Sequence, residues 1–148
     1  MSFPAESDAA PSAAQRRAPE ADAPPCARPL VIYDGACAAC CQAVEWLRRR
    51  EPGALDFVPF QSPVALSSGI PLERLRHQLH LIAPGGATFT GAAAALRLLA
   101  RDPRHARWLR WYEGDATFAE VSEAAYAFIA RHRFLLSWLL PLAGRVQA

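Results

Sequence analysis

The feature that most constrains the fold is a strand, a helix and a second strand in succession, with a Cys-x-x-Cys pair at the first turn. Leu30 to Tyr33 is a short apolar run typical of a buried strand, and Cys37 to Arg50 has helical periodicity. Leu55 to Phe60 returns as a strand. Such a unit predicts two parallel strands joined by a right-handed crossover. It places Cys37 and Cys40 at the start of the helix.

This position suits a redox dithiol. The first N–H groups of a helix lack intrahelical partners, so a thiolate on Cys37 is favoured there. Cys40 lies one turn further on and can resolve a mixed disulfide formed at Cys37. A zinc site would need four ligands, and the remaining cysteines are Cys41, next in sequence, and Cys26. We favour the redox interpretation over a metal site or inert thiols.

Composition separates the chain into a tail and one domain. The first 29 residues contain six prolines and nine alanines without an apolar run, which predicts a disordered tail over 1–29. Residues 30–148 then form the folded domain; the whole chain is 52% hydrophobic. The formal charge of +2 is too weak to indicate a nucleic-acid partner. We expect a cytoplasmic protein, because the chain shows neither a secretory signal nor a membrane-spanning segment.

The rest of the chain predicts a hairpin followed by helices. Leu72 to Arg76 suggests a single helical turn, and Gln78 to Ala83 pairs with Ala87 to Thr90 across Pro84-Gly85-Gly86. Helices are expected from Gly91 to Ala100, from Asp102-Pro103 to Tyr112, and after Asp115. The fold class is therefore α/β, with a central four-stranded mixed sheet flanked by helices and extra C-terminal helices.

The last helix is expected to bury one apolar face. That face consists of Val121, Ala125, Phe128, His132, Leu135 and Leu139. Its apolar end, Phe134 to Leu142, is far shorter than the roughly 20 residues that span a bilayer. It suits an oligomer surface or peripheral contact with a membrane partner.

A family resemblance rests on four blocks of sequence. The element order is that of a thioredoxin-like core. The blocks are Leu30-Val31-Ile32-Tyr33-Asp34-Gly35-x-Cys37-x-x-Cys40 with Val44, Trp46 and Leu47; Phe57 to Ser62; Gly91-Ala92-x-Ala94; and Tyr126-x-x-x-Ala130-x-x-Arg133. Together they resemble the DCC family of predicted thiol-disulfide oxidoreductases, named for its Asp-x-x-Cys-x-x-Cys motif. The resemblance implies a thioredoxin-like fold and a dithiol activity.

The chain departs from the family pattern at several places. Ala38-Ala39 stands where members often carry a Pro-aromatic pair, Cys41 replaces a basic or polar residue, and His132 replaces an Asn. Thioredoxin-like enzymes usually have a cis-proline before the third strand, whereas Arg76 to Leu79 contains no proline. The two residues between the cysteines, Ala38 and Ala39, influence the reduction potential of the pair. The sequence therefore does not predict whether the protein acts as a reductant or an oxidant.

Three further residues are candidates for the site. Asp34 can relay a proton to the dithiol or, as we favour, fix the turn through backbone N–H bonds. Tyr126 and Arg133 are two helical turns apart and share a face. If that face meets the dithiol, Arg133 can pair with Asp34; the alternative is a solvated Arg beside a packed Tyr. Cys41 is expected to serve packing, since it is rotated by about 100° from Cys40.

The sequence therefore predicts a thiol-disulfide oxidoreductase. Cys37 attacks a disulfide of a protein or small-thiol substrate, Cys40 releases the product, and an external thiol restores the dithiol. No cofactor or metal is required, and the His77-x-x-His80 pair is read as surface and core rather than as ligands. The competing functions are a metal-binding module using Cys37 and Cys40, and an interaction domain with a vestigial dithiol.

Overall fold

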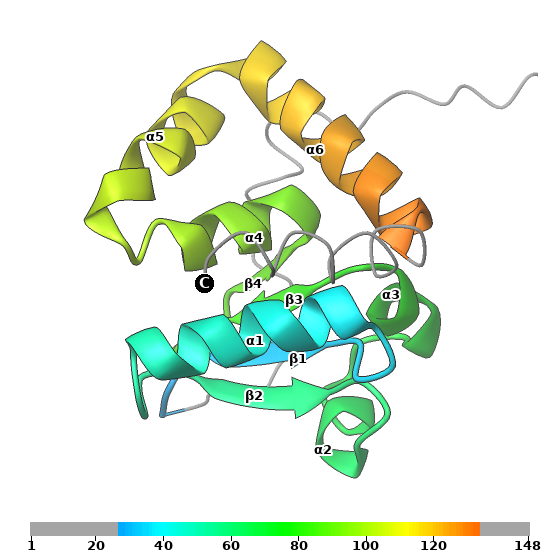
Figure 1. The fold of residues 1–148 in the computed structure, drawn as a ribbon. Helices are drawn as coiled ribbons and strands as arrows, with labels where there is room; N and C mark the ends of the chain where they lie inside the picture. The colour runs from blue at the N-terminus through cyan, green and yellow to red at the C-terminus, as the bar shows by residue number, and fades with distance from the viewer. Residues whose placement is uncertain (1–26, 134–148) are drawn as a thin grey trace, which may run out of the picture.

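A mixed four-stranded sheet forms the centre of the protein. The computed structural model describes residues 27–133. The strands lie in the order β2-β1-β3-β4, with β1 parallel to β2 and antiparallel to β3, and β4 antiparallel to β3. Figure 1 shows helices on both sides of this sheet and a further helical layer beyond it. The arrangement is a thioredoxin-like α/β fold with extra C-terminal helices, as the sequence predicts.

The elements follow the expected order with adjusted ends. The four strands are β1 (Leu30–Tyr33), β2 (Asp56–Pro59), β3 (His80–Ile82) and β4 (Thr88–Thr90). The helices are α1 (Ala38–Arg50), α2 (Pro63–Leu66), α3 (Leu72–His77), α4 (Gly91–Leu99), a 3₁₀ turn (Pro103–His105), α5 (Ala106–Gly114) and α6 (Ala116–Arg131). Three differences from expectation stand out: α2 is additional, β3 is shorter than predicted, and the Asp102-Pro103 pair begins a 3₁₀ turn before α5.

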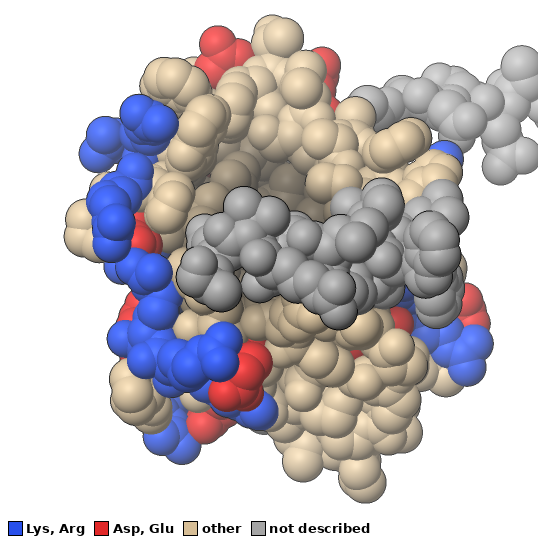
Figure 2. Space-filling model, viewed as in Figure 1, with Lys and Arg blue, Asp and Glu red and all other residues tan. Residues whose placement is uncertain are grey.

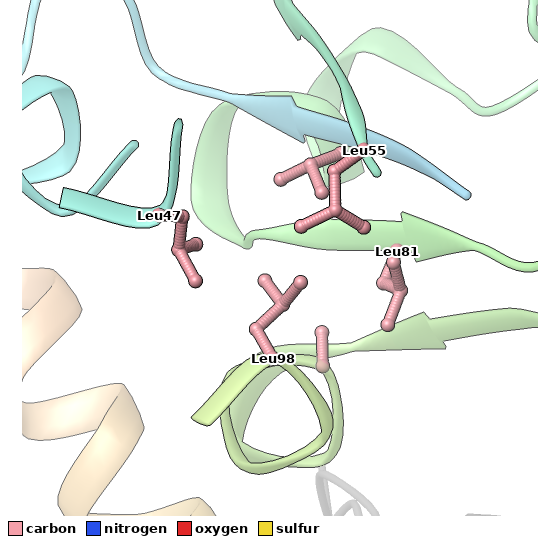
Figure 3. Close-up of a cluster of buried hydrophobic side chains, with 6 residues drawn as sticks. Leu47, Leu55, Leu81 and Leu98 are labelled. Carbon is pink, nitrogen blue, oxygen red and sulfur yellow. The ribbon is translucent and has the colours of Figure 1, made fainter. Parts of the chain in front are cut away.

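The two faces of the sheet carry separate apolar clusters because successive strand residues point to opposite sides. On one face Val31 packs with Leu47 of α1 and Leu98 of α4. Figure 3 shows the leucines of this cluster converging between the sheet and α4. On the other face Ile32 packs with Ala65 of α2 and Leu75 of α3. Helices α1 and α4 therefore share one face of the sheet, and the start of α1 lies beside the end of β1.

A third cluster joins α4 to α5 and α6. It contains Ala92 and Ala93 of α4, Tyr112 of α5 and Ala119 of α6. The carboxylate of Glu123 strengthens the joint, since it accepts hydrogen bonds from the Ala92 backbone N–H at 3.2 Å and from the Tyr112 hydroxyl. An acidic group at the start of α4 also complements the helix dipole. This joint fixes where α6 lies relative to the sheet.

The predicted apolar face of α6 is wrong for its described part. Val121 and Phe128 are 61% and 64% exposed. The face that packs inward instead carries Phe118, Ala119 and Tyr126. The reason lies in the packing of α6 on α4, where small and hydrogen-bonding side chains allow the two helices to approach closely. Helical periodicity alone cannot distinguish this inward face from the adjacent face that carries Val121 and Phe128. Leu135 and Leu139 lie outside the described residues.

The ends of the predicted domain are only partly covered by the structure. Arg28 and Pro29, assigned to the tail from sequence, already contact β2: the Arg28 guanidinium pairs with Asp56 at 2.7 Å, and the Pro29 carbonyl accepts the Asp56 N–H. Residues 1–26, including Cys26, and the apolar run 134–142 lie outside the described part. Between residues 27 and 133, no helix combines the length and apolar content needed to cross a bilayer.

Candidate functional site

The Cys37–Cys40 pair sits at the N-terminus of α1. Cys37 is the N-cap residue, with extended backbone, and its Sγ accepts the Cys40 backbone N–H at 3.3 Å. The Cys40 thiol lies 2.7 Å from the same sulfur and donates to it. Cys37 is buried and Cys40 half-buried, and both are free thiols. Two donors, the Cys40 backbone N–H and the Cys40 thiol, therefore converge on the Cys37 sulfur.

The two thiols differ in their chemistry. Burial above all, together with the hydrogen bond to Cys37 and the charge of Cys37, raises the pKa of the Cys40 thiol to about 12; the nearby Arg133 guanidinium opposes the shift. Cys40 thus remains protonated at neutral pH while it donates to Cys37. Cys40 is therefore the hydrogen-bond donor and the Cys37 sulfur the acceptor in this pair.

Alkylation should reveal this asymmetry. With a limiting amount of iodoacetamide, we expect Cys40 to react at least about tenfold more slowly than neighbouring Cys41 at pH 8, because only a thiolate reacts and the raised pKa of Cys40 removes its thiolate. The Cys40 rate should still rise about tenfold per pH unit between pH 8 and 10. Mass spectrometry of singly modified protein measures both sites. A Cys40 rate that levels off below pH 10 contradicts the assignment.

The Asp34 carboxylate holds the turn before the dithiol. Oδ1 accepts the Ala36 backbone N–H at 2.9 Å, an Asx turn, and also the side-chain amide of Gln61 at 3.0 Å. Oδ2 pairs with the Arg133 guanidinium at 3.2 Å. Backbone, amide and guanidinium groups thus surround Asp34, and its negative charge contributes to the raised pKa of Cys40. This geometry is that of a group that positions the motif.

Gly35 and Gln61 hold the loop that precedes the dithiol against the end of β2. A Cβ atom at Gly35 would lie 2.9 Å from the Pro59 Cβ, so the loop approaches β2 too closely for a larger residue. The Gln61 side chain accepts the Gly35 N–H while donating to Asp34. Sequence reasoning did not assign Gln61 to the site. A usable signal was present, since it follows the end of a strand that pairs in parallel with β1.

Tyr126 of α6 and Arg133, two residues after the end of this helix, both line the pocket beside the dithiol. The Tyr126 hydroxyl accepts the Leu79 backbone N–H at 2.8 Å, and burial raises the pKa of this phenol. Arg133 donates to the Arg76 carbonyl at 3.1 Å besides pairing with Asp34. Of the two interpretations left open by the sequence, the structure shows the paired arginine. Both side chains therefore form hydrogen bonds with the backbone of the segment that precedes β3.

That segment is where thioredoxin-like enzymes usually carry a cis-proline. Residues 27–133 contain no cis peptide bond. Here the backbone N–H of Leu79 is bonded to the Tyr126 phenol. Tyr126 of α6, a helix beyond the basic thioredoxin-like core, thus supplies the hydrogen-bond acceptor for the Leu79 N–H of this segment.

An apolar pocket of about 520 Å³ adjoins the dithiol. Cys37 and Cys40 form part of its wall, together with apolar side chains of α1 and α4 and with Tyr126, Ile129 and Arg133 near the end of α6. Figure 2 shows a hollow whose visible, described sides are formed by residues that are neither acidic nor basic, while arginines gather along one outer edge of this view. Arg133 is the single charged residue among the described lining.

The remaining candidates lie apart from this arrangement. His77 ends α3 at the surface, 3.8 Å from Glu73, whereas His80 is buried in β3. They belong to different elements, one at the surface and one in the core. The Cys41 thiol points back to the Gly35 carbonyl at 3.4 Å. In the described part of the chain, no three His, Cys, Asp or Glu side chains converge in a way that could hold a metal ion.

Comparison with known proteins gives one family and one relative. The family model described as DCC1-like thiol-disulfide oxidoreductase matches residues 31–139, a range that includes the dithiol, Asp34, Tyr126 and Arg133. The uncharacterized protein YuxK of Bacillus subtilis (strain 168) is 29% identical over 112 residues, covering 71% of this chain and 77% of YuxK. No solved structure gives a significant match.

Proposed function

The chain belongs to the DCC1-like thiol-disulfide oxidoreductase family, and from this premise we propose that it catalyses thiol-disulfide exchange through Cys37 and Cys40. The observation that carries the proposal is the 2.7 Å contact between the two sulfurs at the N-terminus of α1. The thiolate is the nucleophile in such exchange, and we assign the attack to Cys37 because two hydrogen bonds converge on its sulfur.

The proposed reaction has two steps. The Cys37 thiolate attacks one sulfur of a substrate disulfide, forming a Cys37–substrate disulfide and expelling the other sulfur as a thiolate that takes a proton. Cys40 then loses its proton and attacks the Cys37 sulfur, forming the Cys37–Cys40 disulfide and releasing the second substrate thiol. An external thiol supplies the two electrons that restore the dithiol. We place this chemistry in the cytoplasm, where such thiols are kept reduced.

We assign Asp34, Tyr126 and Arg133 to positioning rather than to bond making. Asp34 fixes the turn that carries Cys37, and Arg133 links that turn to the backbone before β3. Tyr126 holds the Leu79 N–H of the same segment. Together they connect the turn before the dithiol to the segment before β3. The Arg133 charge also limits how far the pKa of Cys40 rises, which helps Cys40 lose its proton in the second step.

Catalysed exchange with a small disulfide tests the proposal. We expect the full-length protein to accelerate reduction of bis(2-hydroxyethyl) disulfide by glutathione, and Cys37→Ser to fall to the uncatalysed rate because the nucleophile is gone. Cys41→Ser should keep most of the activity, since its thiol contacts a carbonyl outside the pair. Equal rates for Cys37→Ser and wild type would reject catalysis by this dithiol. A stoichiometric metal ion in protein purified with reductant would favour the metal-binding alternative.

A further inference from the structure

The pocket beside the dithiol has the size of a small-molecule site. Its volume of about 520 Å³ lies within the range of roughly 300–1,000 Å³ that is usual for pockets that hold small ligands. Cys37 forms part of the wall and is only 3% exposed, so a substrate sulfur must enter a confined space to reach it. A slender molecule fits this requirement better than a disulfide held in the surface of a folded protein.

The pocket offers no unbalanced charge to an occupant. Arg133 is the single charged residue among the described lining, and the Asp34 carboxylate pairs with it at 3.2 Å. Moving a charged group from water into apolar surroundings without a partner costs free energy, whereas moving an apolar group there is favourable. The walls therefore favour uncharged, apolar groups on the substrate over carboxylates.

The backbone beside the dithiol is not open to a peptide strand. Leu79 lines the pocket, and its N–H already donates to the Tyr126 hydroxyl at 2.8 Å. The Arg76 carbonyl of the same segment accepts a hydrogen bond from Arg133. A peptide that docks as an added strand needs such backbone groups as its partners. These contacts disfavour an extended peptide as the substrate.

We propose that the substrate of the Cys37–Cys40 pair is a small disulfide whose sulfur atoms carry uncharged, apolar groups. This inference rests on the proposed function and specifies its substrate class. The Cys37 thiolate attacks one sulfur and expels the first apolar thiolate, which takes a proton; Cys40 then attacks Cys37 and the second apolar thiol leaves. The substrate gains two electrons, and the dithiol loses the same two. Between the two steps the attached apolar group lies in the pocket.

A matched pair of aromatic disulfides tests this preference. 2,2′-Dithiodipyridine is uncharged at neutral pH, and 6,6′-dithiodinicotinic acid is the same disulfide with a carboxylate on each ring. Full-length, reduced protein carrying Cys26→Ser and Cys41→Ser leaves only the pair to react. The rate of thiopyridone release in one turnover is divided by the rate with dithiothreitol, which removes the intrinsic reactivity of each reagent. We expect this normalised rate to be at least about tenfold higher for the uncharged reagent.

Cations placed in the wall should reduce the preference. Ala43→Arg charges the α1 wall, and Ile129→Arg charges the α6 wall at a residue that is 51% exposed. Each should raise the rate of the dicarboxylate relative to the uncharged reagent at least about tenfold, because the cation balances a carboxylate. Gln42→Arg adds the same charge at an exposed position of α1 outside the described lining, so this ratio should change less than about twofold. Both reagents react with the same Cys37, so its reactivity cancels from the ratio.

The outcomes separate this inference from the proposed function. Equal normalised rates for the two reagents, or a ratio that Ala43→Arg and Ile129→Arg both leave unchanged, overturn the apolar preference while the exchange chemistry stands. Insulin tests the size limit: its normalised rate should be at least about tenfold below that of 2,2′-dithiodipyridine, and an equal rate assigns the dithiol to protein substrates. If Cys37→Ser releases thiopyridone as fast as the starting protein, the proposed exchange itself fails, and this inference fails with it.

Discussion

Cys40→Ser is expected to accumulate covalent, reductant-sensitive adducts in cell extract, at about a hundredfold or more above wild type. In the wild-type protein Cys40 lies 2.7 Å from the Cys37 sulfur, so it resolves a mixed disulfide intramolecularly at high effective concentration. The serine keeps the backbone N–H that donates to Cys37, and its hydroxyl replaces the thiol donor. The variant thus retains the attacking group and loses the resolving one. Mass spectrometry of the adducts identifies the substrates.

Three controls separate this outcome from incidental thiol chemistry. Cys37→Ser should trap few adducts, and Cys37→Ser/Cys40→Ser should give the background. Cys41→Ser is the matched control, because it removes the adjacent thiol, which points to the Gly35 carbonyl; it should trap no more than wild type. If Cys40→Ser traps nothing above the double variant, the dithiol is not an exchange catalyst, and a metal-binding or vestigial role replaces it.

The core of the fold could be predicted because its signals are local. Short apolar strands, the cysteine spacing and the right-handed crossover rule leave few arrangements for residues 30–60. The same logic places Tyr126 and Arg133 on one face of a helix. It could not decide whether that face meets Asp34, since the answer depends on how α6 packs on α4. The Glu123 carboxylate and the small residues of α4 decide it, through contacts 31 residues apart in sequence.

The wrong prediction for α6 and the missed role of Gln61 also arise from contacts between elements that are distant in sequence. Val121 and Phe128 follow the apolar periodicity of a buried face but are exposed, because the close approach of α6 to α4 selects Ala119 and Tyr126 instead. Gln61 looks like an ordinary polar residue after a strand. Its position after a strand parallel to β1 places it at the same edge of the sheet as the dithiol loop, but its bond to Gly35 depends on the register of the two strands. Tertiary packing overrides local pattern in both cases.

Gly91→Ala is expected to lower the free energy of unfolding by roughly 2–4 kcal/mol. Gly91 begins α4 with φ +58°, a conformation that costs an alanine about 1 kcal/mol or more. Its new Cβ would also lie 2.8 Å from Glu123 Oε2. The carboxylate must move away and give up its hydrogen bonds to Ala92 and Tyr112, which leaves buried donors unsatisfied. Urea denaturation measures the loss.

Two other glycines provide the matched series. Gly53 has φ +73°, and a Cβ added there would have nothing within 4 Å, so Gly53→Ala should cost roughly 1 kcal/mol from strain alone. Gly114 ends α5 in open space without positive φ, so Gly114→Ala should be neutral or slightly stabilising.

A double-mutant cycle measures how much Glu123 contributes to the free energy that joins α4 to α6. In a Glu123→Ala background no carboxylate remains to be displaced, so Gly91→Ala should cost only about as much as Gly53→Ala, roughly 1 kcal/mol. The difference between the two backgrounds is the energy with which Glu123 ties α4 to α6, and hence holds Tyr126 and Arg133 against the dithiol loop. Equal costs in both backgrounds would show that Glu123 does not join these helices. The position of α6 would then rest on the apolar contacts of the third cluster and on the hydrogen bond of the Tyr126 hydroxyl.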